Sequence, residues 1–411
     1  MAWLETCVME QRIQFVMDVL DGTYTMSELC DSYRISRKSG YKWLHRYQQG
    51  GIESLANRSR APHDHPQEIS VSVKQAILAV KQRFPRWGAP KIRARLEREH
   101  IDWSHYPAVS TIGLFLRNQG LTRTRRRRRK ATPSAVPLTN GRYANQVWCA
   151  DFKGHFKTGD GRRCHPLTIS DHASRYLLCC KHVDRMSHDP VKRCFERTFR
   201  DYGLPEVIRT DNGAPFASVG LAGLSRLSYW WIRLGIYPER IEPGHPEQNG
   251  RHERMHKTLK ADTAAPPAAS LSQQQLRFNG FRRDYNEQRP HEALEMRTPS
   301  ECYHRSPRSY PRRLPPVWYP DPFRVRHVRT GGEIKLNNNL LYVSQGLAGQ
   351  WVGIEQTDED SSRLWYCNYL LGQIDHRNWT IIPAKLTCNI SPGTWATSKH
   401  NSKKVLPMSP V

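Results

Sequence analysis

The stretch Val147-Trp148-Cys149-Ala150-Asp151-Phe152 is a short apolar run broken by a single carboxylate. An apolar run of about four to eight residues is typical of a buried strand. Further apolar runs follow at 166–171, 176–180 and 206–210, and residues 189–202 have a helical period. Three successive strands, a helix and another strand predict an α/β layer built on a mixed sheet.

Two aspartates belong to these predicted strands. Asp151 lies within the first run, and Asp211 comes directly after the run at 206–210. Burial of a lone carboxylate costs several kcal/mol, and two carboxylates on adjacent strands repel each other unless a divalent cation lies between them. Mg²⁺ binds carboxylate oxygens and leaves positions for water and phosphate. The pair therefore indicates two-metal phosphoryl transfer, although either aspartate taken singly is more typical of a turn or a cap.

A third acid lies in a helix that follows the loop at 245–249. Helical steps of three, four and seven residues from Glu253 lead to His256, Lys257 and Lys260. One face is therefore predicted to present an acid, an imidazole and two ammonium groups, with the apolar positions turned toward a core. An acid beside these cations suits a site that holds a metal and DNA phosphates. By itself, a Glu–Lys pair at this spacing would be ordinary helix surface.

The first sixty residues have the pattern of a helix-turn-helix. Thr25-Met26-Ser27-Glu28 has the form of a capping box, a turn falls at Arg34-Ile35, and Ser36 can cap the next helix. That helix is predicted to place Tyr41 and Leu44 inside. Its outward residues are basic, namely Arg37, Lys38, Lys42 and Arg46. Such an outer face is typical of DNA-binding motifs, although a helical hairpin with solvated charges fits the pattern too.

A second helical region spans residues 71–121, and a basic run follows at 123–130. Helices are expected along an apolar stripe that starts at Val73, after Pro90 and from Ser110. They fit a second DNA-binding unit and a packing module equally well. The basic run repels itself and is predicted to be a linker, or an arm that follows phosphates or enters a minor groove. It includes Arg125, Arg126 and Arg127.

The charge of the chain indicates its partner. Sixty-three Lys and Arg residues against 38 Asp and Glu give a net charge of +25, which favours binding to polyanions, most commonly double-stranded DNA. A merely basic surface, or one that suits anionic lipid, is the alternative. The 411 residues contain no apolar run of about 18, the length of a membrane span, and the first residues lack the layout of a signal peptide. We therefore expect no membrane contact and a cytoplasmic, nucleoid-associated protein.

Three motifs together resemble a known family. Trp148-x-x-Asp151, Thr210-Asp211-Asn212-Gly213 and the stretch from His245 to Arg254 are similar to the motifs of the integrase core that retroviral integrases share with bacterial insertion-sequence transposases of the DDE type. The helix-turn-helix head resembles that of such transposases. The resemblance implies a ribonuclease-H-like core, dependence on two Mg²⁺ (or Mn²⁺) ions, cleavage and joining of DNA at element ends, and a homo-oligomer on DNA.

The same resemblance assigns roles by position. Asp151, Asp211 and Glu253 match the three catalytic, metal-binding acids, and Lys257 and Lys260 match helix positions that contact the DNA end. The chain also departs from the family, because forty-one residues separate Asp211 from Glu253, which is more than the usual spacing.

Two further acids compete with this assignment. Glu247 lies close before Glu253, and Asp171 lies on a strand next to that of Asp151. Asp151 ranks above Asp171 because it belongs to the first strand of the core.

The expected fold is multidomain α/β, with helix-turn-helix units, a ribonuclease-H-like mixed-sheet core and a small C-terminal β-barrel-like domain. Short β runs after residue 324, including one at 363–369, predict this last domain. The expected boundaries are 1–62 for the helix-turn-helix DNA-binding domain and 63–137 for a second helical DNA-binding module with the basic linker. They continue with 138–305 for the integrase core, 306–388 for a Pro-rich linker and small β domain, and 389–411 for a loosely ordered tail.

The leading hypothesis is a transposase that binds element ends and catalyses Mg²⁺-dependent cleavage and strand transfer. One alternative is a DNA-binding regulator with an inactive integrase-like core, which the presence of all three acids disfavours. A ribonuclease-H-like nuclease without joining activity is a third reading, which the helix-turn-helix head disfavours.

Overall fold

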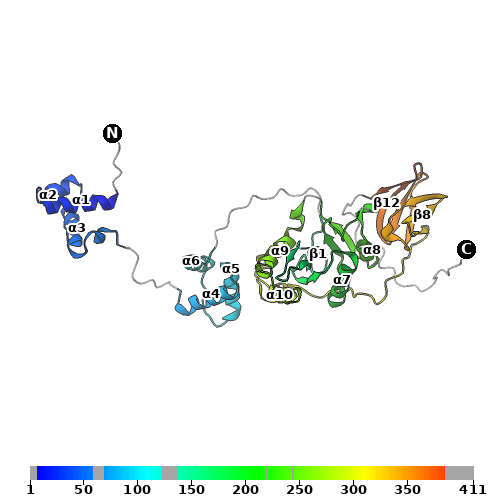
Figure 1. Ribbon diagram of the computed structural model, residues 1–411, viewed down its shortest axis with the longest axis horizontal. Helices are drawn as coiled ribbons and strands as arrows, with labels where there is room; N and C mark the ends of the chain where they lie inside the picture. The colour runs from blue at the N-terminus through cyan, green and yellow to red at the C-terminus, as the bar shows by residue number, and fades with distance from the viewer. Residues whose placement is uncertain are drawn as a thin grey trace. The chain divides into compact units, whose positions relative to one another are not determined.

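The computed structural model describes residues 7–58, 69–122, 138–152, 154–218, 220–242 and 245–384. The chain divides into two compact units, 1–73 and 74–411 (Figure 1). No helix in the described ranges is long and apolar enough to cross a membrane. Arg125, Arg126 and Arg127 of the basic run, and the tail at 389–411, lie outside the described residues.

The first unit has the predicted helix-turn-helix caps. Its elements are α1 (Val8–Asp21), α2 (Met26–Ser32), α3 (Arg37–Gly50) and the 3-10 turn η1 (Ile52–Leu55). The backbone N–H groups of Thr25 and Glu28 donate to each other's side chains, as in a capping box. Ser36 caps α3, and Arg34 takes a φ of 52° in the turn between the helices. The core comprises Phe15, Val16, Leu29, Cys30 and Leu55.

Helix α3 approaches α2 closely at Gly40, where an added Cβ would lie 2.6 Å from the Cys30 sulfur. Its inner face continues through Trp43, Leu44 and Tyr47, which follow the helical stripe from Gly40. The prediction that Tyr41 lies inside is wrong. Tyr41 is 57% exposed, because it stands one residue beyond Gly40 and outside that stripe.

Helices α4 (Val71–Arg83), α5 (Ala89–Glu99) and α6 (Val109–Asn118) form the second helical module. Cations of α5 contact the segment that ends the core: Arg95 donates to Gln288, and Arg98 donates to Glu301. Burial lowers the pKa of Lys91 to about 8. Helix α5 therefore packs against this segment, and DNA binding by the module stays a prediction.

A six-stranded mixed sheet forms the centre of the second unit. Its strands are β1 (Val147–Phe152), β2 (Phe156–Lys157), β3 (Arg163–Asp171), β4 (Leu177–Val183), β5 (Val207–Thr210) and β6 (Tyr237–Arg240). The order is β2-β3-β1-β5-β6, with β4 also paired to β3. The β1–β3 and β3–β4 pairs are antiparallel, whereas β1–β5 and β5–β6 are parallel. The predicted mixed sheet is confirmed.

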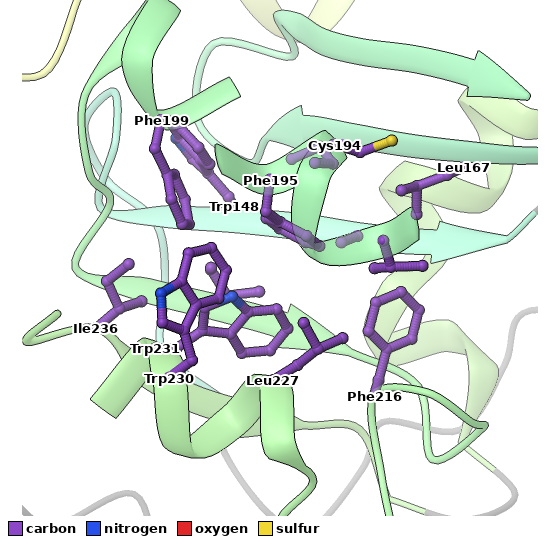
Figure 2. Packing of buried hydrophobic residues seen from close by; sticks show 14 of the residues in the cluster. Trp148, Leu167, Cys194, Phe195, Phe199, Phe216, Leu227, Trp230, Trp231 and Ile236 are labelled. Carbon is purple, nitrogen blue, oxygen red and sulfur yellow. The ribbon is translucent and has the colours of Figure 1, made fainter. Parts of the chain in front are cut away.

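Helices cover both faces of this sheet. On one face α7 (His188–Tyr202) and α8 (Arg226–Arg233) enclose an aromatic core with Trp148, Phe195, Phe199 and Trp231 (Figure 2). On the other face lie α9 (Gly250–Thr263) and α10 (Leu271–Arg283), which bury Met255, Leu259 and Phe278. Shorter helical segments are η2 (Leu221–Gly223), η3 (Pro246–Asn249), η4 (Asp284–Gln288), η5 (Glu292–Leu294) and α11 (Pro299–Cys302).

The C-terminal part is an antiparallel sheet region. It contains β7 (Arg324–His327), β8 (Glu333–Leu336), β9 (Asn339–Tyr342), η6 (Gln345–Leu347), β10 (Trp351–Gln356), β11 (Ser361–Tyr366), β12 (Tyr369–Asp375) and β13 (Thr380–Pro383). Five strands pair in the order β13-β12-β11-β10-β7, and β8 pairs with β9. The single run expected at 363–369 is wrong, because a turn with Cys367 at φ 51° divides it between β11 and β12. The barrel-like closure stays a prediction.

Candidate active site

Two carboxylates lie at the carboxyl ends of the paired strands β1 and β5. On β1, Trp148 packs beneath α7 and α8, so the alternation of a strand places Asp151 on the opposite face. The parallel register sets Cys149 beside Arg209, an offset of sixty residues. The same offset sets Asp211, the first residue after β5, beside Asp151. Continued two residues beyond the last paired position, this register therefore predicts that the two aspartates are neighbours at one edge of the sheet.

Each aspartate has contacts that orient it. The Asp151 side chain is 19% exposed, and its Oδ2 lies 3.6 Å from His256 Nδ1. The Thr168 hydroxyl donates to the Asp151 carbonyl oxygen at 3.2 Å. The Gly213 N–H donates to Asp211 Oδ1 at 3.2 Å. Both carboxylates are thus partly solvated groups at the edge of the core.

Helix α9 covers the face to which Asp151 belongs. Glu253 lies in its first turn and is exposed, as are Lys257 and Lys260. The prediction that His256 shares this exposed face is wrong, because it is 2% exposed and packs on the sheet. The buried stripe runs through His252, Met255, His256 and Leu259, and Glu253 stands one residue outside it.

Asp171, the competitor of Asp151, has a structural role. It is 1% exposed, and its carboxylate accepts hydrogen bonds from the Asn145 N–H (2.7 Å) and from the N–H and hydroxyl of Ser174 (2.8 and 2.6 Å). Burial raises the pKa of Asp171, and these hydrogen bonds oppose the rise. With its oxygens already engaged, Asp171 ties the end of β3 to neighbouring turns. The side chain of the other competitor, Glu247, lies outside the described residues.

The donor chemistry of the three predicted acids fits a hard divalent cation. Carboxylate oxygens are the ligands that Mg²⁺ prefers, and the three acids come from β1, the end of β5, and α9. Within the described ranges, no three His, Cys, Asp or Glu side chains lie close enough together to bind a metal ion. The set therefore matches Mg²⁺ in chemistry without forming a closed three-ligand site here.

A buried ion pair next to the aspartates was missed by the sequence reasoning. Arg209 Nε donates to Glu239 Oε2 at 2.6 Å, and both side chains are 3% exposed. The backbone of Thr139 completes the pair, because its N–H donates to Glu239 and its carbonyl accepts from Arg209. The available signal was an acid and a base at matched positions of two adjacent strands. It could not be used because the polar strand β6 was not predicted from the sequence.

The basic residues predicted for α3 lie mainly on its surface. Arg37, Lys38 and Lys42 are exposed, and Arg46 is half-buried. The Arg46 guanidinium lies 4.9 Å from the centre of the Trp43 ring, whose other cationic neighbours include Arg12 at 3.9 Å. Cations of this kind on the second helix of the motif form a candidate nucleic-acid interface.

Sequence comparison with protein families matches both parts of this arrangement. Residues 142–246 and 234–299 match two models of the integrase core domain. The chain contains an integrase core. Residues 11–63 match a helix-turn-helix domain, and residues 39–116 match a homeodomain-like domain. An integrase core behind helix-turn-helix segments makes the chain a relative of bacterial insertion-sequence transposases.

Two curated relatives are similar to this chain over 59% of its length. The uncharacterised 31.7 kDa protein of insertion element IS407 from Burkholderia multivorans is 29% identical over 243 residues, which cover 59% of this chain and 83% of that protein. The transposase InsD of insertion element IS2 from Escherichia coli is 25% identical over 257 residues, covering 59% and 80%.

Solved structures include the catalytic core domain of HTLV-2 integrase in complex with magnesium. Its sequence identity is 17% and its TM-score 0.32, with 40% of this chain and all of that chain covered. The assignment of an integrase core therefore rests on the family models.

Proposed function

We propose that this protein is a transposase that binds the ends of a mobile element and catalyses Mg²⁺-dependent DNA cleavage and strand transfer. The observation that carries the proposal is that Asp151 lies on β1 and Asp211 directly follows β5, which pairs in parallel with β1 in an integrase core. Helix α9, which carries Glu253, packs on the same face. When bound, divalent ions would supply positive charge for the developing negative charge of phosphoryl transfer.

Different residues would bind the metal ions and the DNA. Asp151, Asp211 and Glu253 would hold the ions through their carboxylates. Lys257 and Lys260, exposed on α9, would bind the backbone of the DNA end, since ammonium groups bind phosphate as point charges.

The DNA-locating contacts would come from the basic residues of the head and of the linker. They are Arg37, Lys38, Lys42 and Arg46 on α3, and Arg125, Arg126 and Arg127 in the run outside the described residues. The expected partners are double-stranded DNA and further copies of the chain, because two ends must be held together. A nucleoid-associated location follows from the same proposal.

The decisive experiment assays joined products with the full chain, Mg²⁺ and the native DNA flanking the gene. We expect joining by the wild type, and a loss on the order of a thousandfold or more for Glu253→Gln, Asp151→Asn and Asp211→Asn, as for removal of other essential catalytic groups. Asp201→Asn is the matched control, since Asp201 is an exposed acid of α7, and it should join normally.

Two results would contradict the proposal. Hydrolysis without any joined product would identify a nuclease. Tight binding to the flanks with no chemistry by the wild type would identify a DNA-binding regulator with an inactive core.

A further inference from the structure

The buried face of α9 contains two histidines where a helix on a sheet normally places apolar residues. His252 and His256 are each 2% exposed, and their rings lie 4.5 Å apart in an edge-to-face arrangement. They are one helical turn apart, so both point toward the same strand.

Strand β3 offers matching polar groups beneath them. The Thr168 hydroxyl, which is fully buried, contacts His252 Nε2 at 2.8 Å and His256 Nε2 at 2.5 Å. The Ser170 hydroxyl contacts His252 Nδ1 at 2.7 Å. Thr168 is also the register partner of Asp151 on β1. Two hydroxyls and two imidazoles therefore form a buried clasp between α9 and β3.

Such a clasp fixes α9 in a way that apolar packing does not. Buried polar groups that lose their partners cost free energy, and hydrogen bonds require particular directions as well as contact. Because both imidazoles engage one hydroxyl, neither rotation nor sliding of α9 preserves all the bonds. Glu253 directly follows His252 in the helix, so the clasp also fixes the direction in which Glu253 leaves α9.

His256 extends the clasp to the first acid. Its Nε2 is bonded to Thr168, which leaves Nδ1 on the other side of the ring, 3.6 Å from Asp151 Oδ2. That separation is longer than a hydrogen bond, and it is an ion pair when the imidazole is protonated. One imidazole thus joins the helix of Glu253 to the carboxylate of Asp151.

We propose that His256 is a positioning residue, which, held by the clasp on Thr168, orients the Asp151 carboxylate for a divalent cation. The proposal rests on the proposed function, since it assigns Asp151 to the metal site. It also predicts that the two ring nitrogens have separable roles.

Two substitutions separate these roles in the full chain. In His256→Asn the amide nitrogen replaces Nδ1 and keeps the contact with Asp151, whereas in His256→Gln the longer side chain replaces Nε2 and keeps the bond to Thr168. Thr258→Ala is the control, because the Thr258 hydroxyl bonds only to the Arg254 carbonyl within α9 among the contacts described.

The first measurement is the affinity of the full chain for Mn²⁺ in the absence of DNA, monitored by electron paramagnetic resonance. We expect His256→Gln to weaken Mn²⁺ binding about tenfold, while His256→Asn and Thr258→Ala stay within about twofold of the wild type. Joining by His256→Gln should recover in part at high Mg²⁺. Equal Mn²⁺ affinity in His256→Gln and the wild type would overturn the proposal, and so would equal weakening by both substitutions, which indicates packing alone.

A second measurement does not depend on catalysis or on metal. In the chain labelled with ¹⁵N-histidine, the His256 signals are identified by their loss in either variant. Asp151→Asn should shift them, and Asp211→Asn should shift them less. Unchanged signals in Asp151→Asn would overturn the proposal. If the wild type binds Mn²⁺ as expected but joins no DNA, the proposed function fails and the positioning role of His256 stands.

Discussion

At the scale of single residues, Asp151 and Asp171 are two acids on neighbouring strands with opposite surroundings. Asp171 is 1% exposed and accepts three hydrogen bonds, whereas Asp151 is partly solvated. We therefore expect Asp171→Asn to destabilise the core by about 2–3 kcal/mol, because the new amide group turns a donor toward donors and loses charge-assisted bonds. Asp151→Asn should change the free energy of unfolding by less than about 1 kcal/mol.

Urea unfolding of the full chain, monitored by tryptophan fluorescence, tests this difference in stability between the two variants. Joining activity per folded molecule is measured in parallel, and it should be largely kept in Asp171→Asn and lost in Asp151→Asn. If Asp171→Asn leaves stability unchanged and abolishes joining, Asp171 is the first catalytic acid and the ranking from sequence is wrong.

The sequence predicted the elements that carry these acids better than it predicted their neighbours. Asp151 was placed on a strand and Glu253 on a helix correctly, since apolar runs and helical steps define those elements. His256 was assigned to the wrong face because steps of three and four from Glu253 cover two sides of a helix. Only the Thr168 hydroxyl on β3, which contacts the imidazole, decides between these sides. No local sequence pattern predicts that partner.

At the scale of elements, the close approach of α2 and α3 depends on Gly40. A Cβ there would lie 2.6 Å from the Cys30 sulfur and 3.0 Å from Met26 Sδ. Gly40→Ala gains helix propensity of about 1 kcal/mol, but overpacking a core costs about 1–3 kcal/mol. We expect a net loss of stability in the first unit, and weaker DNA binding by α3.

Hydrogen exchange of peptides from residues 7–58, measured in the full chain, reports this loss. Gly280→Ala in α10 is the matched control, since an added Cβ there meets no atom within 4 Å, and it should stabilise slightly. Slower exchange in Gly40→Ala than in the wild type would show that α2 and α3 are packed less tightly than this distance indicates.

The sequence predicted helices and strands correctly where the residues of the element itself define it. The strands β1, β3, β4 and β5 follow apolar runs, and the caps of α2 and α3 follow local side chains. Strand β6, Tyr237-Pro238-Glu239-Arg240, escaped recognition because it is polar and contains proline. It is stabilised by pairing with β5 and by the ion pair of Glu239 with Arg209. Those partners lie far away in the sequence.

At the scale of the whole second unit, the C-terminal sheet and the integrase core share one hydrophobic cluster. Leu224, Tyr229 and Ile232 from α8 and its preceding loop pack with Val352 and Leu371 of the sheet. The Tyr229 and Tyr366 rings meet edge to face at 5.7 Å. Since neither part buries this apolar surface by itself, the integrase core and the C-terminal sheet should unfold together, despite the Pro-rich segment that joins them.

Two valines of the same sheet test this coupling. Val352 is fully buried and Val325 is 39% exposed. We expect Val352→Ala to lower the free energy of unfolding by about 2 kcal/mol, from lost burial and the cavity left behind, and Val325→Ala to change it by less than about 0.5 kcal/mol. The loss in Val352→Ala should be the same for hydrogen exchange of C-terminal peptides and of peptides from β1 and α7. If only the C-terminal peptides lose protection, the sheet is a separate folding unit that merely contacts α8. Equal loss of protection in both regions would mean that a substitution in the C-terminal sheet also destabilises the part of the core that carries Asp151. Joining activity of C-terminal variants must therefore be normalised to the amount of folded protein.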